Sequence, residues 1–250
     1  MPFSEAIDMR FDFRVIVSML LFFRAMLAHG ELSLDKQQEC VMFLAMSSSV
    51  IANHRLLGKL EDVTRAGQLT EDGYLVLLDE FRDVGEAGDL DAQLQLGKVY
   101  NSELCGPRDE KETEYWYKKA AQQGDGEAQY RLGQLYMGIR EVVHGGKRPT
   151  GKPLLLDYEE GVYWLLKSAE QNDKRAQGDL GFLYGKERPL KKDLISAYMW
   201  LTLAAGEADT AYEKHMLDLR DKYAREMSSV QIARAKRLVR KWRKEHVEYE

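Results

Sequence analysis

Apolar and small residues recur at helical spacing in several similar stretches between residues 92 and 205. In the first of these, Ala92, Leu96 and Tyr100 stand at i, i+4 and i+8, which places them on one stripe of an α-helix. A second stripe follows, in which Trp116 is succeeded four residues later by Ala120. The pattern predicts a pair of helices.

This pair of stripes occurs three times, and each copy begins with Ala-Gln-x-x-Leu-Gly-x-x-Tyr. The alanines lie 36 and then 48 residues apart, and the tryptophans lie 48 and then 36 apart. One period of 36 with a 12-residue insertion explains all four spacings. A single pair cannot bury its apolar stripe alone, so we expect the pairs to stack. The recurring columns are Ala92, Ala128, Ala176; Leu96, Leu132, Leu180; Gly97, Gly133, Gly181; Tyr100, Tyr136, Tyr184; and Trp116, Trp164, Trp200.

Small and acidic residues support the same division. Glycine at position 97 and alanine at position 120 allow two helix axes to approach closely, while the aromatic residues fill the remaining volume. An aspartate stands between the repeats, just before a predicted helix start, where a carboxylate accepts hydrogen bonds from unpaired backbone N–H groups. This column consists of Asp89, Asp125, Asp173 and Asp209.

These residues resemble the Sel-one-like repeat family, which is related to the tetratricopeptide repeats. The family pattern is Ala-x-x-x-Leu-Gly-x-x-Tyr, a turn, then Ala-x-x-Trp-Tyr-x-Lys-Ala-Ala-x-x-Gly, and Glu114 to Gly124 follow its second part closely. Residues Ala197 to Ala205 are similar to a last repeat, and Met227 to Trp242 to a capping helix. The resemblance covers roughly residues 89 to 246. The insertion and the missing Gly-x-Gly turn after Tyr100 depart from the pattern.

The resemblance implies an all-α, right-handed superhelical solenoid of two-helix repeats. Residues 70–208 would hold the repeats, with a partial unit at 70–88 and full units at 89–124, 125–172 and 173–208. Residues 1–69 would form an irregular helical N-terminal segment, and residues 209–250 the C-terminal capping helices. The seven exposed cations expected on the final helix fit a polar end cap, and an alternative is a patch for nucleic acid or acidic lipid.

Composition limits the other functions. The net charge is −5, so the molecule as a whole does not attract nucleic acid, and none is expected as a partner. The uncharged run Val15 to Phe23 is too short to span a membrane, and two cysteines, Cys40 and Cys105, favour a reducing compartment. We expect a cytoplasmic protein, or a periplasmic one if residues 1–28 form a signal peptide. The apolar segment Phe11 to Ala28 is either buried or a docking surface.

No catalytic or metal-binding pattern is found. The loop from Gly146 to Pro153 is similar to a phosphate-binding loop, but Pro153 replaces the hydroxyl that would hold magnesium. The five histidines lack the spacing of a metal site. The sequence therefore predicts no cofactor, no metal and no enzyme; the alternative is a hydrolytic enzyme whose site the sequence does not reveal.

Binding of a partner protein is the function that the resemblance implies. We expect a scaffold or adaptor, bacterial in type, that holds its partner on the concave surface; the alternative is an immunity-type inhibitor of a toxic secreted effector such as a lipase. Helix geometry assigns the columns opposite the Ala-Leu-Tyr stripe to that surface. If the chain's own ends cover the groove, this site is lost. The predicted protein-binding residues are Leu94, Lys98, Asn101, Tyr130, Gln134, Met137 and Phe182.

Overall fold

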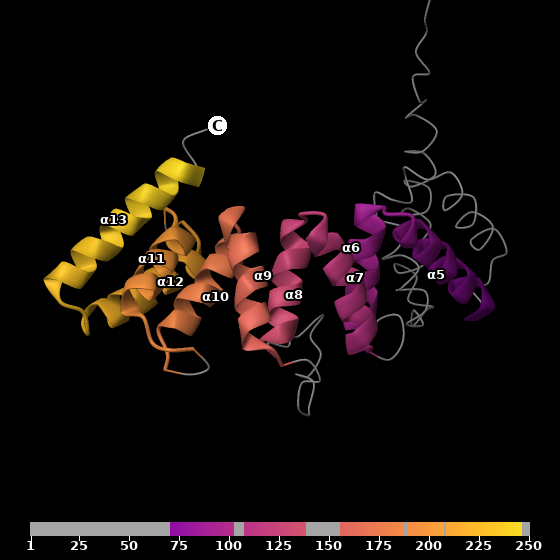
Figure 1. Cartoon of the computed structure of the whole chain (residues 1–250), viewed down its shortest axis with the longest axis horizontal. Helices are drawn as coiled ribbons and strands as arrows, with labels where there is room; N and C mark the ends of the chain where they lie inside the picture. Colours follow the sequence, from indigo (N-terminus) through magenta and orange to yellow (C-terminus); the bar gives the residue numbers. More distant parts are fainter. Residues whose placement is uncertain (1–70, 103–107, 139–155, 188–189, 208, 247–250) are drawn as a thin grey trace, which may run out of the picture. The chain divides into compact units, whose positions relative to one another are not determined.

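The computed structural model describes residues 71–102, 108–138, 156–187, 190–207 and 209–246. Every regular element within these ranges is an α-helix (Figure 1). The expected all-α helical-repeat fold is therefore confirmed, while the handedness of the superhelix stays a prediction. The N-terminal segment, both cysteines and the loop that is similar to a phosphate-binding loop lie outside the described residues.

The chain divides into two compact units. One comprises Met1–Gln95 and Ser102–Arg108, and the other comprises Leu96–Asn101 and Asp109–Glu250. The first unit contains α5 (Glu71–Glu86) and the beginning of α6 (Leu90–Asn101). The second contains α7 (Glu110–Gln122), α8 (Gly126–Tyr136), α9 (Tyr158–Glu170), α10 (Lys174–Tyr184), α11 (Leu194–Ala205), α12 (Ala211–Ala224) and α13 (Ser229–His246).

The turn that ends one repeat and starts the next has a constant geometry. Gly88, Gly124 and Asn172 take positive φ values of 104°, 97° and 65°. The backbone N–H of the following aspartate then donates to a carbonyl five residues earlier, as in Asp125 to Ala120, 3.2 Å. This closes the preceding helix by the motif in which a left-handed residue satisfies the last carbonyls. Glycine, or asparagine in its place, is needed because other residues rarely adopt this conformation.

Aspartate caps follow these turns, as the sequence predicts, with one exception. Asp125 accepts from the N–H of Ala128, 2.6 Å, and Asp89 from that of Ala92, 2.8 Å. The predicted cap at Asp209 is wrong, because Thr210 caps α12 in a reciprocal pair with Glu213. A further set of caps escaped the sequence analysis. The aspartates that begin the second helix of each pair are Asp109, Asp157 and Asp193.

The glutamine of each Ala-Gln step ties one repeat to the one before. Its side-chain amide donates to a carbonyl eight residues earlier, in the last turn of the preceding helix. The bonds run from Gln93 to Gly85, 2.8 Å, from Gln129 to Ala121, 3.1 Å, and from Gln177 to Ala169, 3.2 Å. Because the bond to Gly85 reaches α5, this helix occupies the position of a second helix in an earlier repeat.

Close contact between the helices of a pair explains the glycine column. A Cβ built on Gly133 would lie 2.8 Å from Cγ of Leu165, and one built on Gly181 would lie 2.6 Å from Cγ of Leu201. A side chain larger than hydrogen at either position would force the helices apart. The glycines therefore set the separation at which α8 packs on α9 and α10 on α11.

The three tryptophans are buried in equivalent positions, as predicted. Trp116 is 2% exposed, and Trp164 and Trp200 are each 6% exposed. Trp200 meets Trp242 of α13 edge to face, with ring centroids 6.3 Å apart. Val239 joins the same core cluster, and Ala235 is also fully buried, so the terminal helix packs one apolar side against the last repeat.

Helices α12 and α13 both cover α11 of the last repeat. The side chain of Tyr212 on α12 lies against Gly178 of α10, and that of Tyr223 lies against Gly185. The hydroxyl of Tyr212 also donates to the carbonyl of Lys174, 3.1 Å. Side chains of α12 thus reach α10, while α12 and α13 both pack mainly on α11. The end of the chain supplies a further pair of helices that covers the last repeat.

Candidate functional site

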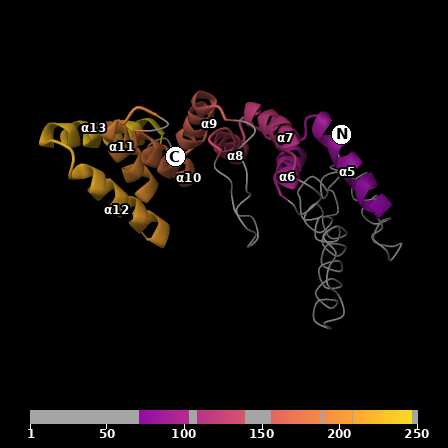
Figure 2. The ribbon, with the colours of Figure 1, turned by 90° about the horizontal axis from the view of Figure 1, so that it is seen from below.

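Helices α8 to α13 form two layers. Figure 2 shows α8, α10 and α12 on one side and α9, α11 and α13 on the other. We call the first set the first-helix layer and the second set the second-helix layer. Neighbouring helices of the first-helix layer contact each other through side chains, because Arg175 of α10 binds Glu127 of α8 and Lys174 of α10 binds Glu213 of α12.

Three residues predicted to line an open groove are buried instead. Tyr130 is 5% exposed, and Gln134 and Met137 are each 7% exposed. The ring of Tyr130 lies beneath the guanidinium of Arg175, at 4.4 Å, and Met137 fills the space beside Gly161. The expectation that these side chains are free for a partner is wrong. The first helix of a repeat is covered on one side by the second helix of the same repeat and on another side by the next repeat.

The other predicted binding residues have more exposure. Leu94, Lys98 and Asn101 are partly exposed, and Phe182 is 43% exposed. The ammonium group of Lys186 lies 3.6 Å from the centroid of the Phe182 ring. Their role in partner binding stays a prediction. Of these four residues, Phe182 lies on α10, the helix whose charged residues contact α8.

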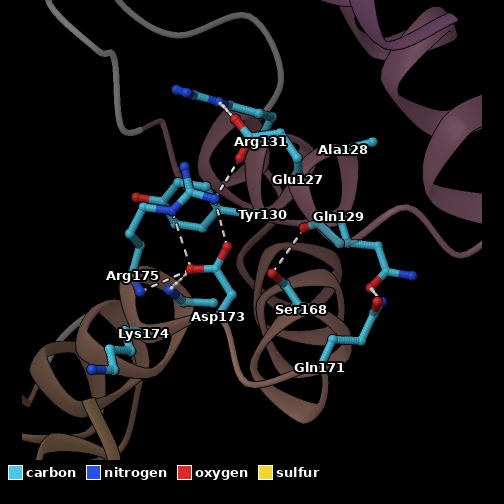
Figure 3. Close-up of polar contacts among 12 residues, drawn as sticks. Glu127, Ala128, Gln129, Tyr130, Arg131, Ser168, Gln171, Asp173, Lys174 and Arg175 are labelled. Carbon is cyan, nitrogen blue, oxygen red and sulfur yellow. Dashed lines mark hydrogen bonds and ion pairs between the residues drawn. The ribbon is translucent and has the colours of Figure 1, made fainter. Parts of the chain in front are cut away.

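A row of charged side chains crosses from α8 to α10 (Figure 3). Glu127 pairs with Arg131 one turn later, 2.7 Å, and also accepts from Arg175. Arg175 in addition donates to Asp173, 2.5 Å, and stacks on Tyr130. We call Glu127, Arg131, Asp173, Arg175 and Asp179 the polar row. Its central member, Arg175, is held by two carboxylates and an aromatic ring, so its position is well defined.

The electrostatic environment favours the charged forms of Glu127 and Arg175. Burial alone would raise the pKa of Glu127, but the hydrogen bond from Arg175 and the charge of Arg131 outweigh it, so the pKa is lowered. The pKa of Arg175 is raised, chiefly by its hydrogen bond to Asp173 and further by Glu127. Each charge therefore stabilises its neighbour in the charged form.

Asp179 differs from the rest of the polar row. Burial raises its pKa to about 6, and hydrogen bonds from Gln134 and Tyr130 offset only part of this shift. The amide of Gln134 lies 3.3 Å from Asp179 and 2.6 Å from the Tyr130 hydroxyl. Burial together with Asp179 raises the pKa of Tyr212 to about 12. The carboxylate of Asp179 is thus a partly desolvated acceptor between α8, α10 and α12.

Replacing Asp179 with asparagine should stabilise the protein at neutral pH. Folding raises the pKa of Asp179 from 3.8 to about 6. The contribution of the protonated carboxyl to the free energy of unfolding is therefore complete below pH 3.8 and is lost as the pH rises through about 6. The free energy of unfolding of Asp179→Asn should therefore be about 1 kcal/mol higher than that of the parent at pH 7.5, and equal to it near pH 4. Urea denaturation at both pH values measures this. The exposed carboxylate variant Asp218→Asn is the control, and an equal gain there would contradict the account.

Neither a candidate metal cluster nor a membrane-spanning helix occurs among the described residues. In the ranges given above, no three histidine, cysteine or acidic side chains gather closely enough to hold a metal ion. Among the same residues, no helix has both the length and the apolar character needed to cross a bilayer. What the polar row can do is bind: it presents fixed cations, a carboxylate acceptor and an adjacent aromatic ring.

The polar row was missed because its residues lie outside the columns that were assigned to the groove. A signal was nevertheless available. Glu127 and Arg131 stand at i and i+4, and Arg175 and Asp179 occupy the same two columns with the charges reversed. Complementary pairs in consecutive repeats indicate that the two helices face each other with matched charges.

Comparisons with known proteins agree with the repeat pattern. A family model for the Sel1 repeat matches residues 90–125, 126–142, 146–173 and 174–209. The gap between the second and third segments falls within the predicted insertion. No curated protein matches the chain.

Two solved structures are similar to the chain. One is a Sel1 repeat protein from Oxalobacter formigenes, with 22% identity, 65% of this chain and 73% of that chain covered, and a TM-score of 0.41. The other is c5321, a protective antigen of uropathogenic Escherichia coli strains with an SLR fold, with 21% identity and a TM-score of 0.38. That match covers 87% of this chain and 50% of c5321, so the chain spans half the length of that protein.

The matched segments can be set against the helices. The first contains α6 and α7, the second and third together contain α8 and α9, and the fourth contains α10 and α11. Each of these three helix pairs therefore corresponds to one repeat of the family. Residues 90–209 are Sel1 repeats, and the chain is a Sel1-repeat helical protein.

Proposed function

We propose that this chain is a scaffold that binds one partner protein through the exposed side of α8 and α10. Sel1-repeat proteins are generally scaffolds for protein interactions, and the bacterial setting expected from the sequence is part of the proposal. The surface consists of the polar row together with Phe182 and Lys186. The observation that carries the proposal is Arg175, which is fixed between Glu127, Asp173 and the ring of Tyr130.

Fixed side chains favour binding because less conformational entropy is lost when a partner docks. Arg175 connects two successive first helices, so the spacing of the polar groups on α8 and α10 is set by the stacking of repeats. Arginine and aromatic residues are also the types that contribute most to protein interfaces. The exposed Phe182 lies on the same helix and offers an apolar anchor beside the charges.

The second-helix layer provides a matched comparison. Tyr163 on α9 is 48% exposed, and the ammonium of Lys167 lies 6.0 Å from the centroid of its ring. This pair has the same i, i+4 spacing as Phe182 and Lys186. Its polar contact, from Lys167 to Glu170, stays within α9. The two aromatic–lysine pairs therefore test which layer binds.

The experiment begins with the full chain as bait in its native host, followed by purification of the partner that it retains. The double variant Phe182→Ala/Lys186→Glu should weaken that partner's affinity by roughly 100-fold, as expected for an aromatic anchor and a charge reversal. Tyr163→Ala/Lys167→Glu should change it less than about threefold. Titration calorimetry gives both values. Recovery of no stable partner, or an equal or larger loss in the α9 variant, would refute the proposal.

A further inference from the structure

Helix α13 carries an unusual density of exposed positive charge. Its 18 residues include seven cations and a single carboxylate, Glu245. All seven cationic side chains are exposed. Since the whole chain has a net charge of −5 and α13 contributes +6, the remaining residues carry −11. The cations are Arg234, Lys236, Arg237, Arg240, Lys241, Arg243 and Lys244; we call them the basic face.

Anchoring of the helix fixes where these charges point. Ala235, Val239 and Trp242 are buried, and Val239 and Trp242 belong to the core cluster that contains Trp200. Helix periodicity then places the cations on the opposite half of the surface. They form two rows with i, i+4, i+7 spacing and one additional arginine. The rows are Lys236, Arg240, Arg243 and Arg237, Lys241, Lys244.

An end cap requires a polar face but does not require a face of one charge. Like charges at i and i+4, such as Arg237 and Lys241, destabilise a helix. Attraction to the helix C-terminus favours cations only in the last turn, so it does not account for Arg234 or Lys236. In the described part of the chain, the ion pair between these cations and a carboxylate is that of Lys241 with Glu245, 3.7 Å. The uniform positive charge therefore destabilises the helix, and the fold does not require it.

We infer that the basic face binds a short acidic segment of a partner protein. Charge complementarity selects an anionic ligand, and the length of α13, about 27 Å, matches an extended segment of about eight residues. A bilayer is disfavoured because the apolar side of α13 is buried in the core and cannot insert. A nucleic acid is disfavoured because a long polyanion would extend beyond α13 towards a molecule whose remainder is strongly acidic.

The test uses the full chain and a labelled peptide of about ten residues with alternating glutamate and serine. The same peptide with glutamine in place of glutamate is the neutral control. Arg237→Gln/Lys241→Gln/Lys244→Gln should weaken binding of the acidic peptide roughly tenfold or more. The matched triple variant Lys214→Gln/Lys222→Gln/Arg225→Gln removes three exposed cations in and beside α12. It should change binding less than about threefold, because it alters net charge equally but leaves the basic face intact.

Fluorescence anisotropy measures these affinities at about 150 mM salt, because long-range electrostatic attraction is largely screened at that concentration. The basic-face variant should melt at the same or a slightly higher temperature than the parent, which separates lost binding from unfolding. Four results would each overturn the inference: equal binding of the glutamine peptide, an equal loss in the α12 variant, tighter binding of a duplex DNA, or tighter binding of phosphatidylserine vesicles. None of these variants touches Phe182 or Lys186, so this result is independent of the proposed function.

Discussion

Replacing Trp200 with alanine should lower the free energy of unfolding by about 4 kcal/mol, within the range measured for buried aromatic residues. Trp200 is 6% exposed and packs edge to face on Trp242. It lies in the same cluster as Leu180 and Leu203, so the substitution leaves a cavity between α10, α11 and α13. Urea denaturation followed by circular dichroism measures the loss. Because α13 depends on this contact, its detachment should accompany the loss of stability.

The control for this prediction is an apolar residue of the same layer that lies in solvent. Val230, near the start of α13, is 75% exposed. Val230→Ala should change the free energy of unfolding by less than about 0.5 kcal/mol. Similar losses for the two variants would mean that Trp200 does not hold the last repeat to the terminal helix.

Substitution of Gly181 by alanine should destabilise the protein by about 2 to 3 kcal/mol. The added Cβ would lie 2.6 Å from Cγ of Leu201 and 3.0 Å from the backbone nitrogen of the same residue. Alanine is otherwise a better helix former than glycine by about 1 kcal/mol, so a net loss requires the clash to dominate. The midpoint of urea denaturation provides the measurement.

A second glycine, Gly126, separates the effect of the clash from the effect of helix propensity. A Cβ on Gly126 would meet Oε1 of Gln171 at 3.3 Å, so only a small shift of this side-chain end is needed. Gly126→Ala should therefore be neutral or slightly stabilising. In addition, Leu201→Ala should relieve the clash, so the double variant with Gly181→Ala should lose less stability than the sum of the single variants. Additive losses would show that α10 and α11 do not meet at this glycine.

The repeat itself could be predicted from the sequence because its features are local. Trp116, Trp164 and Trp200 recur with the spacing of one repeat, and each is buried as that spacing requires. The aspartate caps at Asp125 and Asp173 were foreseen for the same reason, since a cap and its helix are neighbours in sequence. Such short-range patterns follow from helix geometry alone.

The site was harder to predict because it depends on contacts between repeats. Tyr130 and Met137 were assigned to an open surface from the geometry of one helix, but Arg175 of the next repeat covers Tyr130, and Met137 packs beside Gly161 of α9. The contact of Arg175 with Glu127 joins residues 48 positions apart, a distance lengthened by the insertion. Asp209 fits the cap column, yet Thr210 forms the cap because Glu213 can return the hydrogen bond.

The most direct test of the proposed binding surface is amide hydrogen exchange of the full chain, measured with and without the purified partner. The account predicts that the partner slows exchange in α8 and α10 and leaves α9 and α11 nearly unchanged, because bound side chains suppress local opening of the helix that carries them. Slowed exchange confined to α9 and α11, with α8 and α10 unaffected, would contradict it.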